Sequence, residues 1–395
     1  MIHRILIWLI LGIVLPYVYL YRRFWQHRDT GGRCGQWRWL WWLPPIGMLI
    51  FTFALSACRD FVPTNMMWIR LYLYLLGIFV LPQMLFTLCL ALGQAGQRWC
   101  HCKKHLGYKI GFLLVLLFLP AYYYGLLWGW RGLEVRHVDI CLKNLPKSFD
   151  GYRIVHFSDA HVGTFIGVGA KVLQRDIDSI NAQKADLIVF TGDLQNVRPS
   201  ELYPFKHLLA SLKAKDGVVS ILGNHDYSAY TAAKPAVAKA NERLLRSMEY
   251  QMGWRLLANT HWALGRGQDS IYLAGEENES TDSRFNHLDR AATYAGIPRG
   301  SFVIALQHNP ERWPEALHPH GNRPLPRLTL SGHTHGGQIS ILGWRPTQWR
   351  YRYDYGLAEL HGHYLYVSGG IGGLVPFRLG VTPEITVITL HHSDI

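Results

Sequence analysis

The sequence predicts an α/β protein in which four transmembrane α-helices precede a domain of alternating strands and helices. Three observations support this prediction. The first 130 residues contain four long apolar runs, the remaining residues alternate short β-branched segments with helical stretches, and the positive charge is concentrated beside the apolar runs. At 395 residues the chain is also longer than one ordinary domain. We therefore expect a membrane domain over residues 1–130 and a second domain over residues 131–395.

The four apolar runs have the length and the boundaries of membrane-spanning helices. They cover residues 5–21, 40–57, 71–92 and 110–128. Each is close to the roughly 20 residues that cross a hydrocarbon core. Each contains proline, which membrane helices tolerate better than soluble helices do. Tyr21, Arg22 and Arg23 follow the first run in place of a small-residue cleavage site, which favours a retained helix over a signal peptide.

Positive charge is concentrated in two of the loops between these runs. The first 130 residues carry twelve Lys and Arg but only Asp29 and Asp60 as acidic residues, so they account for most of the formal net charge of +13. This excess is typical of loops beside membrane helices, and a nucleic-acid partner is not expected from it. The basic residues of the first and third loops are Arg22, Arg23, Arg28, Arg33, Arg38, Arg98, Lys103, Lys104 and Lys109. Because basic loops stay in the cytoplasm and the number of spans is even, we expect an integral protein of the cytoplasmic membrane whose second domain lies on the outer, periplasmic or extracellular, face.

The second domain begins at about Val135, where strand and helix patterns start to alternate. The predicted strands are Arg153–Ser158, Leu187–Thr191, Val218–Leu222, Ser270–Ala274, Phe302–Gln307, Leu328–Ser331, Tyr364–Val367 and Ile385–Leu390. The predicted helices are Val168–Asn181, Glu201–Leu212, Ala232–Tyr250 and Phe285–Tyr294. Such alternation indicates an α/β fold with buried sheets.

Five polar clusters each follow one of these strands directly. They are Asp159-Ala160-His161, Gly192-Asp193, Gly223-Asn224-His225-Asp226, His308 and Gly332-His333-Thr334-His335. In α/β sheets, ligands gather at the carboxyl ends of the strands. The shared placement therefore predicts that these clusters meet in space, although they are spread over about 175 residues of sequence.

The residue types in the clusters suit a pair of divalent metal ions. Carboxylates and imidazoles bind Mn, Fe or Zn, and a carboxylate can bridge two metals. Two ions about 3.5–4 Å apart can clamp a phosphate, lower the pKa of a bound water and stabilise a leaving oxygen. Each cluster alone could be a polar turn, but the five together, each at a strand end, favour a metal site.

The order of the clusters resembles that of the calcineurin-like metallophosphoesterase superfamily. Ser158-Asp159-Ala160-His161, Gly332 to Gln338 and Arg378 to Ile385 are most similar to its membrane-associated bacterial members, which have N-terminal transmembrane helices. The resemblance covers about residues 135–395. It implies a sandwich of two mixed β-sheets flanked by helices.

The resemblance also implies a role for each clustered residue. Asp159, His161 and His335 would hold the first of two divalent ions, Asp193 would bridge to the second, and Asn224, His308 and His333 would complete the second. His225 would stay unligated near the leaving group, as a general acid or charge stabiliser. Asp226 would orient the His225 ring, because an imidazole needs a partner on one nitrogen to fix its tautomer.

The implied activity is hydrolysis of a phosphate ester or phosphoanhydride by a hydroxide that the two metals activate. The four spans favour membrane lipids and phosphorylated or lipid-linked small molecules as partners, including phospholipids. Two alternatives remain open. One is a UDP-2,3-diacylglucosamine pyrophosphatase step of lipid A synthesis, which needs a cytoplasmic site. The other is a membrane sensor that uses the domain for ligand binding only.

Residues 344–353 mix aromatic side chains with arginine. Such a surface suits a lipid interface, with rings in the headgroup layer and guanidinium groups on phosphates. It equally suits stacking on single-stranded nucleic acid. A packed hairpin with exposed arginines is the third interpretation.

Overall fold

The computed structural model describes residues 2–26, 38–63, 65–100, 105–319, 321 and 323–394. Contacts divide the chain into two compact units, residues 1–128 and residues 129–395. The basic residues Arg28, Arg33, Lys103 and Lys104, on which the predicted orientation partly rests, lie outside the described residues.

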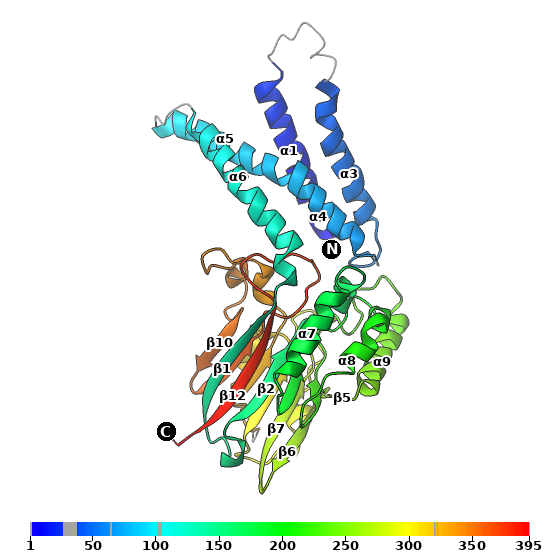
Figure 1. Ribbon diagram of the computed structural model, residues 1–395, viewed down its shortest axis with the longest axis vertical. Helices are drawn as coiled ribbons and strands as arrows, with labels where there is room; N and C mark the ends of the chain where they lie inside the picture. The colour runs from blue at the N-terminus through cyan, green and yellow to red at the C-terminus, as the bar shows by residue number, and fades with distance from the viewer. Residues whose placement is uncertain are drawn as a thin grey trace. The chain divides into compact units, whose positions relative to one another are not determined.

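The first unit consists of apolar helices (Figure 1). They are η1 (Ile2–Ile5), α1 (Leu6–Phe24), η2 (Arg38–Trp42), α3 (Leu43–Ser56), α4 (Met67–Phe79), α5 (Leu81–Cys100) and α6 (Leu106–Leu127). Among the described residues, four helical stretches are long and apolar enough to cross a membrane: Leu6–Phe24, Arg38–Ser56, Met67–Trp99 and Leu106–Arg131. The prediction of four long apolar helices is confirmed, and the chain is an integral membrane protein by this measure.

The third span is not the continuous helix that was predicted over residues 71–92. α4 ends at Phe79, and α5 begins at Leu81. Pro82 explains the interruption, because proline lacks an N–H group and disfavours helical backbone at the preceding residue. Within this unit α5 and α6 pack closely through glycine: a Cβ added to Gly93 would lie 2.7 Å from Gly107 Cα.

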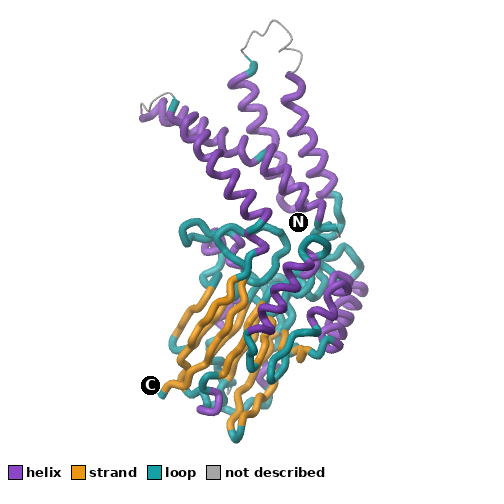
Figure 2. The backbone as a smooth tube through the Cα atoms, viewed as in Figure 1, coloured by secondary structure: helices purple, strands orange, loops and turns teal. Residues whose placement is uncertain are grey.

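The second unit is a sandwich of two mixed six-stranded sheets (Figures 1 and 2). The first sheet has the order β1 (Glu134–Lys143), β12 (Glu384–Ser393), β2 (Tyr152–Phe157), β3 (Leu187–Phe190), β4 (Val218–Ser220), β5 (Trp254–Leu256). The second has the order β10 (Gly356–Leu360), β11 (His363–Val367), β9 (Leu328–Ser331), β8 (Val303–Gln307), β7 (Asp269–Glu276), β6 (Thr260–Arg266). Strands β2 to β5 are parallel, as are β7, β8, β9 and β11. The predicted two-sheet fold is confirmed.

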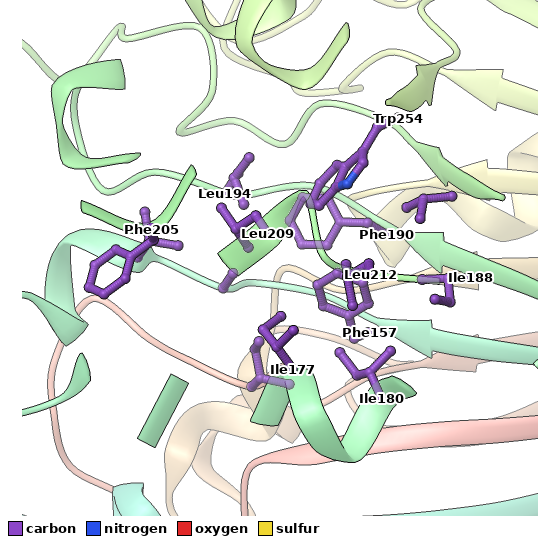
Figure 3. Close-up of a cluster of buried hydrophobic side chains, with 14 of the residues drawn as sticks. Phe157, Ile177, Ile180, Ile188, Phe190, Leu194, Phe205, Leu209, Leu212 and Trp254 are labelled. Carbon is purple, nitrogen blue, oxygen red and sulfur yellow. The ribbon is translucent and has the colours of Figure 1, made fainter. Parts of the chain in front are cut away.

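Both faces of the central strands are buried, and successive residues belong to different cores. In β3, Leu187 and Val189 join the core between the two sheets, whereas Ile188 and Phe190 join the core beneath the helices. This division follows from the alternation of side chains along a strand. Three helices cover that outer face: α7 (Ala170–Ala182), α8 (Lys206–Leu209) and α9 (Pro235–Gln251). Figure 3 shows Ile177 and Ile180 beside Phe157 and Phe190 in the outer core.

The four strands that the sequence did not predict are β1, β5, β6 and β10, and they are the four sheet edges. Two predicted helices are also shorter than expected. Glu201–Leu212 is a 3₁₀ helix (Pro199–Phe205) followed by α8, because Pro204 removes a backbone donor. Phe285–Tyr294 is helical only in α10 (Arg290–Tyr294), where the Asp289 side chain accepts from the Ala292 N–H.

Candidate metal centre

The seven predicted metal ligands lie on the loops that follow five inner strands of the two sheets. They are Asp159 and His161 after β2, Asp193 after β3, Asn224 after β4, His308 after β8, and His333 and His335 after β9. The first sheet therefore contributes three loops and the second sheet two. Five of the side chains are buried, and those of His333 and His335 are partly accessible.

Three side chains form a first group of possible ligand atoms. Asp159, His161 and His335 each offer one donor atom, and these atoms lie within 4.8 Å of one another. His335 Nε2 is 3.3 Å from Asp159 Oδ1, and the rings of His161 and His335 are stacked with centroids 5.3 Å apart.

A second group consists of Asp193, His308 and His333, again with donor atoms within 4.8 Å of one another. Asn224 adds an oxygen to this group: its Oδ1 lies 3.2 Å from His308 Nε2 and 2.8 Å from His333 Nδ1. The Asn224 amide nitrogen donates to the Tyr230 hydroxyl at 2.9 Å. Because the nitrogen is engaged there, the amide oxygen is the atom that faces the imidazoles.

Asp193 lies between the two groups. Its Oδ2 is 3.6 Å from His161 Nε2 on one side and 3.2 Å from His308 Nε2 on the other. Its Oδ1 accepts the backbone N–H of His225 at 2.8 Å. One oxygen is therefore held by the backbone, and the other is shared between the two groups, which is the arrangement that a bridging carboxylate needs.

The backbone around these side chains is strained. Five of the seven residues have positive φ angles in the left-handed region: Asp159 (51°), His161 (43°), Asp193 (61°), His333 (72°) and His335 (52°). Each such residue costs about 1–3 kcal/mol and persists only where the surroundings determine it, so such residues cluster at functional sites. A Cβ added to Gly223 would collide with Asp193 Oδ1, and one added to Gly332 would collide with Asp159 Oδ2.

Burial and neighbouring charges shift the pKa of several of these groups. Burial lowers the pKa of His161 and His333 to about 3, so their imidazoles are neutral and carry a free lone pair. Burial, with the Asp193 charge nearby, raises the pKa of Asp159 to about 6. Burial also disfavours the charged form of His308, but the carboxylates of Asp193 and Asp159 outweigh it and raise its pKa to about 9. The donor set of carboxylate, imidazole and amide groups around buried negative charge fits two divalent cations.

The comparisons with known proteins agree with this geometry. The family model described as "Calcineurin-like phosphoesterase" matches residues 152–337. The metallophosphoesterase YkuE of Bacillus subtilis is 32% identical over 259 residues, which are 63% of this chain and 82% of YkuE. The chain belongs to the calcineurin-like phosphoesterase family. A transmembrane protein with a metallophosphoesterase domain from Danio rerio is 32% identical over 68% of this chain and 60% of its own length. A metallophosphoesterase from Aquifex aeolicus is 27% identical over 65% of this chain and 92% of its own length.

Family membership makes the chain a metallophosphoesterase, and its buried His and Asp groups are consistent with a dimetal centre. His225, the predicted catalytic histidine of this phosphoesterase, lies against both groups. Its ring centroid is 4.8 Å from that of His161, and its donor atom lies within 4.8 Å of those of His161 and Asp193. The neighbouring Tyr230 ring stacks on it at 4.2 Å.

The prediction that Asp226 orients the His225 ring is wrong. Both carboxylate oxygens of Asp226 accept backbone N–H groups, from Asp193, Leu194, Gln195 and Gly223, at 2.7–3.3 Å. Asp226 is fully buried and joins the loops after β3 and β4. Its role in this phosphoesterase is to hold the loops that carry Asp193 and Asn224.

The His225 ring bonds the backbone carbonyl of Asn196 and not, as predicted, the side chain of Asp226. The carbonyl lies 2.5 Å from His225 Nδ1, so this nitrogen carries the proton that it donates to the carbonyl. Glu201 holds the carbonyl in turn, because its carboxylate accepts the N–H groups of Asn196 (2.5 Å), Val197 (3.0 Å) and Arg198 (3.2 Å). The sequence signal was Pro199 at the first position of a helix with Glu201 two residues later, which is typical of an N-terminal cap.

Two tyrosines near the ligands were not predicted as site residues. Tyr230 accepts from Asn224 and stacks on His225. The Tyr351 hydroxyl lies 3.2 Å from His333 Nε2. Tyr351 belongs to the aromatic and arginine-rich stretch 344–353, which the structure therefore brings to the edge of the metal centre.

Proposed function

We propose that this metallophosphoesterase hydrolyses a phosphate ester or phosphoanhydride of a membrane-associated or lipid-linked substrate, with two Mn, Fe or Zn ions as cofactors. The observation that carries the proposal is the Asp193 Oδ2 atom, which lies 3.6 Å from His161 and 3.2 Å from His308. When bound, two such ions lower the pKa of a water molecule and stabilise negative charge on a phosphate.

In this proposal seven residues would bind the metal ions, and His225 would transfer a proton. Asp159, His161 and His335 would hold the first ion, Asn224, His308 and His333 would hold the second, and Asp193 would be shared between them. His225 has its Nδ1 proton directed at the Asn196 carbonyl. When the ring is protonated on both nitrogens, the opposite nitrogen, Nε2, would donate its proton to the leaving oxygen of the substrate, and the ring would be left neutral with its remaining proton on Nδ1.

The membrane spans support a substrate that resides in or at a bilayer. α6 ends at Leu127 and β1 begins at Glu134, so only residues 128–133 join the last span to the catalytic domain. Six residues extend over at most about 20 Å. Such a short connection keeps the domain near the headgroup layer, where phospholipids and lipid-linked phosphates present their phosphates.

Hydrolysis of a soluble aryl phosphodiester by the purified full-length chain tests the proposed chemistry. The rate is expected to disappear when a chelator removes the metals and to return when Mn, Fe or Zn is added. A chain that contains both metals but hydrolyses neither soluble nor bilayer-embedded phosphates would instead support a ligand-binding sensor.

The outer-face orientation of the catalytic domain is a separate part of the proposal, and it rests on the basic loops. Cys141 is exposed on β1 and offers a natural label in a variant whose other five cysteines are Ser. A membrane-impermeant maleimide is expected to label Cys141 in cells with an intact cytoplasmic membrane. Labelling only after that membrane is broken would place the site in the cytoplasm and favour the UDP-2,3-diacylglucosamine pyrophosphatase step.

A further inference from the structure

The catalytic domain carries a turn whose large apolar side chains are exposed to solvent. Ile341 and Trp344 form a two-residue hairpin, with backbone bonds of 2.9 and 3.0 Å, around Leu342 and Gly343. Leu342 has a φ of 52° and Gly343 a φ of 85°. Such turns favour Asn or Asp at the first position, because these residues tolerate positive φ. The backbone of Leu342 is therefore strained, and its side chain is completely exposed to solvent.

The apolar surface extends from the turn to the aromatic residues that follow it. Trp349 is 83% exposed, and its ring packs edge-on against that of Trp344 at 5.1 Å. Ile341 is also exposed. We call residues 341–352 the tip segment. Its exposed side chains of Ile, Leu and Trp are those that a bilayer interface buries favourably, and its arginines suit the phosphates of the headgroups.

The tip segment is held in one conformation by polar contacts at its base. Arg345 makes a two-bonded ion pair with Asp354, at 2.7 and 2.9 Å, and Thr347 donates to the same carboxylate at 2.8 Å. The Ser340 N–H donates to the Leu379 carbonyl at 2.7 Å. The exposed apolar side chains therefore extend from a base that an ion pair and hydrogen bonds connect to the rest of the domain.

This base is bonded directly to the metal-binding loop. The Thr334 hydroxyl, between His333 and His335, donates to the Asp354 carbonyl at 2.5 Å. Tyr351 of the tip segment reaches His333 Nε2. The tip segment thus lies beside the candidate metal centre.

We propose that the tip segment docks into the headgroup layer of an anionic phospholipid bilayer, with Leu342 and Trp349 as its inserted side chains. A bilayer is the occupant that the rest of the chain supports, because the same chain carries four spans and a short connection to this domain. Single-stranded nucleic acid fits less well, because Leu342, the most exposed side chain of the turn, offers no ring for stacking. The inference does not depend on the phosphoesterase chemistry.

Photocrosslinking of the full-length chain in vesicles of phosphatidylethanolamine and phosphatidylglycerol tests the proposal without a measurement of catalysis. The variants Leu342→p-benzoylphenylalanine and Trp349→p-benzoylphenylalanine are expected to form phospholipid adducts. The matched control is Tyr250→p-benzoylphenylalanine, since Tyr250 on α9 is equally exposed, at 81%, and should form none. Absence of adducts at both tip positions, or equal yields at Tyr250, would overturn the proposal, as would replacement of the lipid adducts by adducts to added single-stranded DNA.

A second substitution shows whether the turn itself drives the docking. With the crosslinker at position 349, Leu342→Asp is expected to reduce the lipid adduct about tenfold, because burial of a leucine contributes about 1.5–3 kcal/mol and each 1.4 kcal/mol is tenfold in binding. Tyr250→Asp should leave the yield unchanged. Thermal melting of each variant verifies that it is folded, and an unchanged adduct in a folded Leu342→Asp variant would contradict the role of the turn.

Discussion

The two sheets contribute different chemistry to the metal centre. The first sheet supplies both carboxylates, Asp159 and Asp193, together with His161, Asn224 and His225, whereas the second sheet supplies only imidazoles. Each of the two ligand groups draws on both sheets. The carboxylates therefore come from one side of the sandwich, and the imidazoles that complete each group come from the other.

The largest effect is expected where the charge of the first sheet is removed. Asp193→Asn should abolish activity and reduce the content of both metals, because the lost charge is shared between the two groups. Loss of several kcal/mol of transition-state stabilisation corresponds to at least about 10³-fold in rate. Metal analysis and turnover on an aryl phosphodiester measure this. Asp178→Asn, on the surface of α7, is the control, and near-normal turnover and metal content in Asp193→Asn would refute the shared carboxylate.

Removal of a second-sheet imidazole should have a more selective effect. His308→Ala is expected to lose one metal ion per chain and to retain the other, because the first group keeps Asp159, His161 and His335. Activity should still fall steeply, since one ion no longer stabilises the phosphate charge. His207→Ala, an exposed histidine on α8, should keep both ions. Loss of both ions from His308→Ala would show that the two groups do not bind independently.

His225→Ala separates ligation from proton transfer on the first-sheet side. Both metals should remain bound, while turnover falls by about the 10²–10⁴-fold that is typical of lost acid–base assistance. The structure places His225 within reach of His161 and Asp193, so the metal content of this variant is informative. If metal were lost in parallel with activity, His225 would be a ligand and not the proton donor.

The sequence predicted the parts of this domain that are buried and apolar on both faces. All eight inner strands were anticipated, because each is a run of apolar residues. The edge strands β1, β5, β6 and β10 were missed because they are half-exposed and carry polar and charged residues among the apolar ones. Runs of apolar residues therefore predict which strands are buried, but they do not predict which segments pair at the edges of a sheet.

The seven candidate ligands were predicted for a related reason: each is a side chain at the end of an inner strand. The partner of His225 could not be found in this way, because it is the backbone carbonyl of Asn196, which every residue possesses. Asp226 was assigned to His225 from the family resemblance, but its carboxylate accepts hydrogen bonds from four backbone N–H groups. Tyr351 reaches His333 through a loop whose path no local pattern indicates.

The smallest effect is expected for Glu201→Gln, which acts on His225 only through the Asn196 loop. Loss of one charged hydrogen bond is worth about 1.5 kcal/mol, so turnover should fall about tenfold while KM and metal content stay unchanged. The pH profile should also shift, since the ring partner of His225 becomes less well held. Glu242→Gln, in a partly buried ion pair on α9, is the control and should change neither quantity. A purely structural role for Glu201 would instead lower the melting temperature without a change in turnover or pH profile.

Anomalous X-ray diffraction from crystals of the manganese-loaded protein tests the shared metal centre most directly. Two anomalous peaks about 3.5–4 Å apart are expected, one beside Asp159, His161 and His335 and the other beside Asn224, His308 and His333, with Asp193 Oδ2 in contact with both. A single peak at full occupancy, or two peaks of which only one contacts Asp193, would contradict the two-metal account.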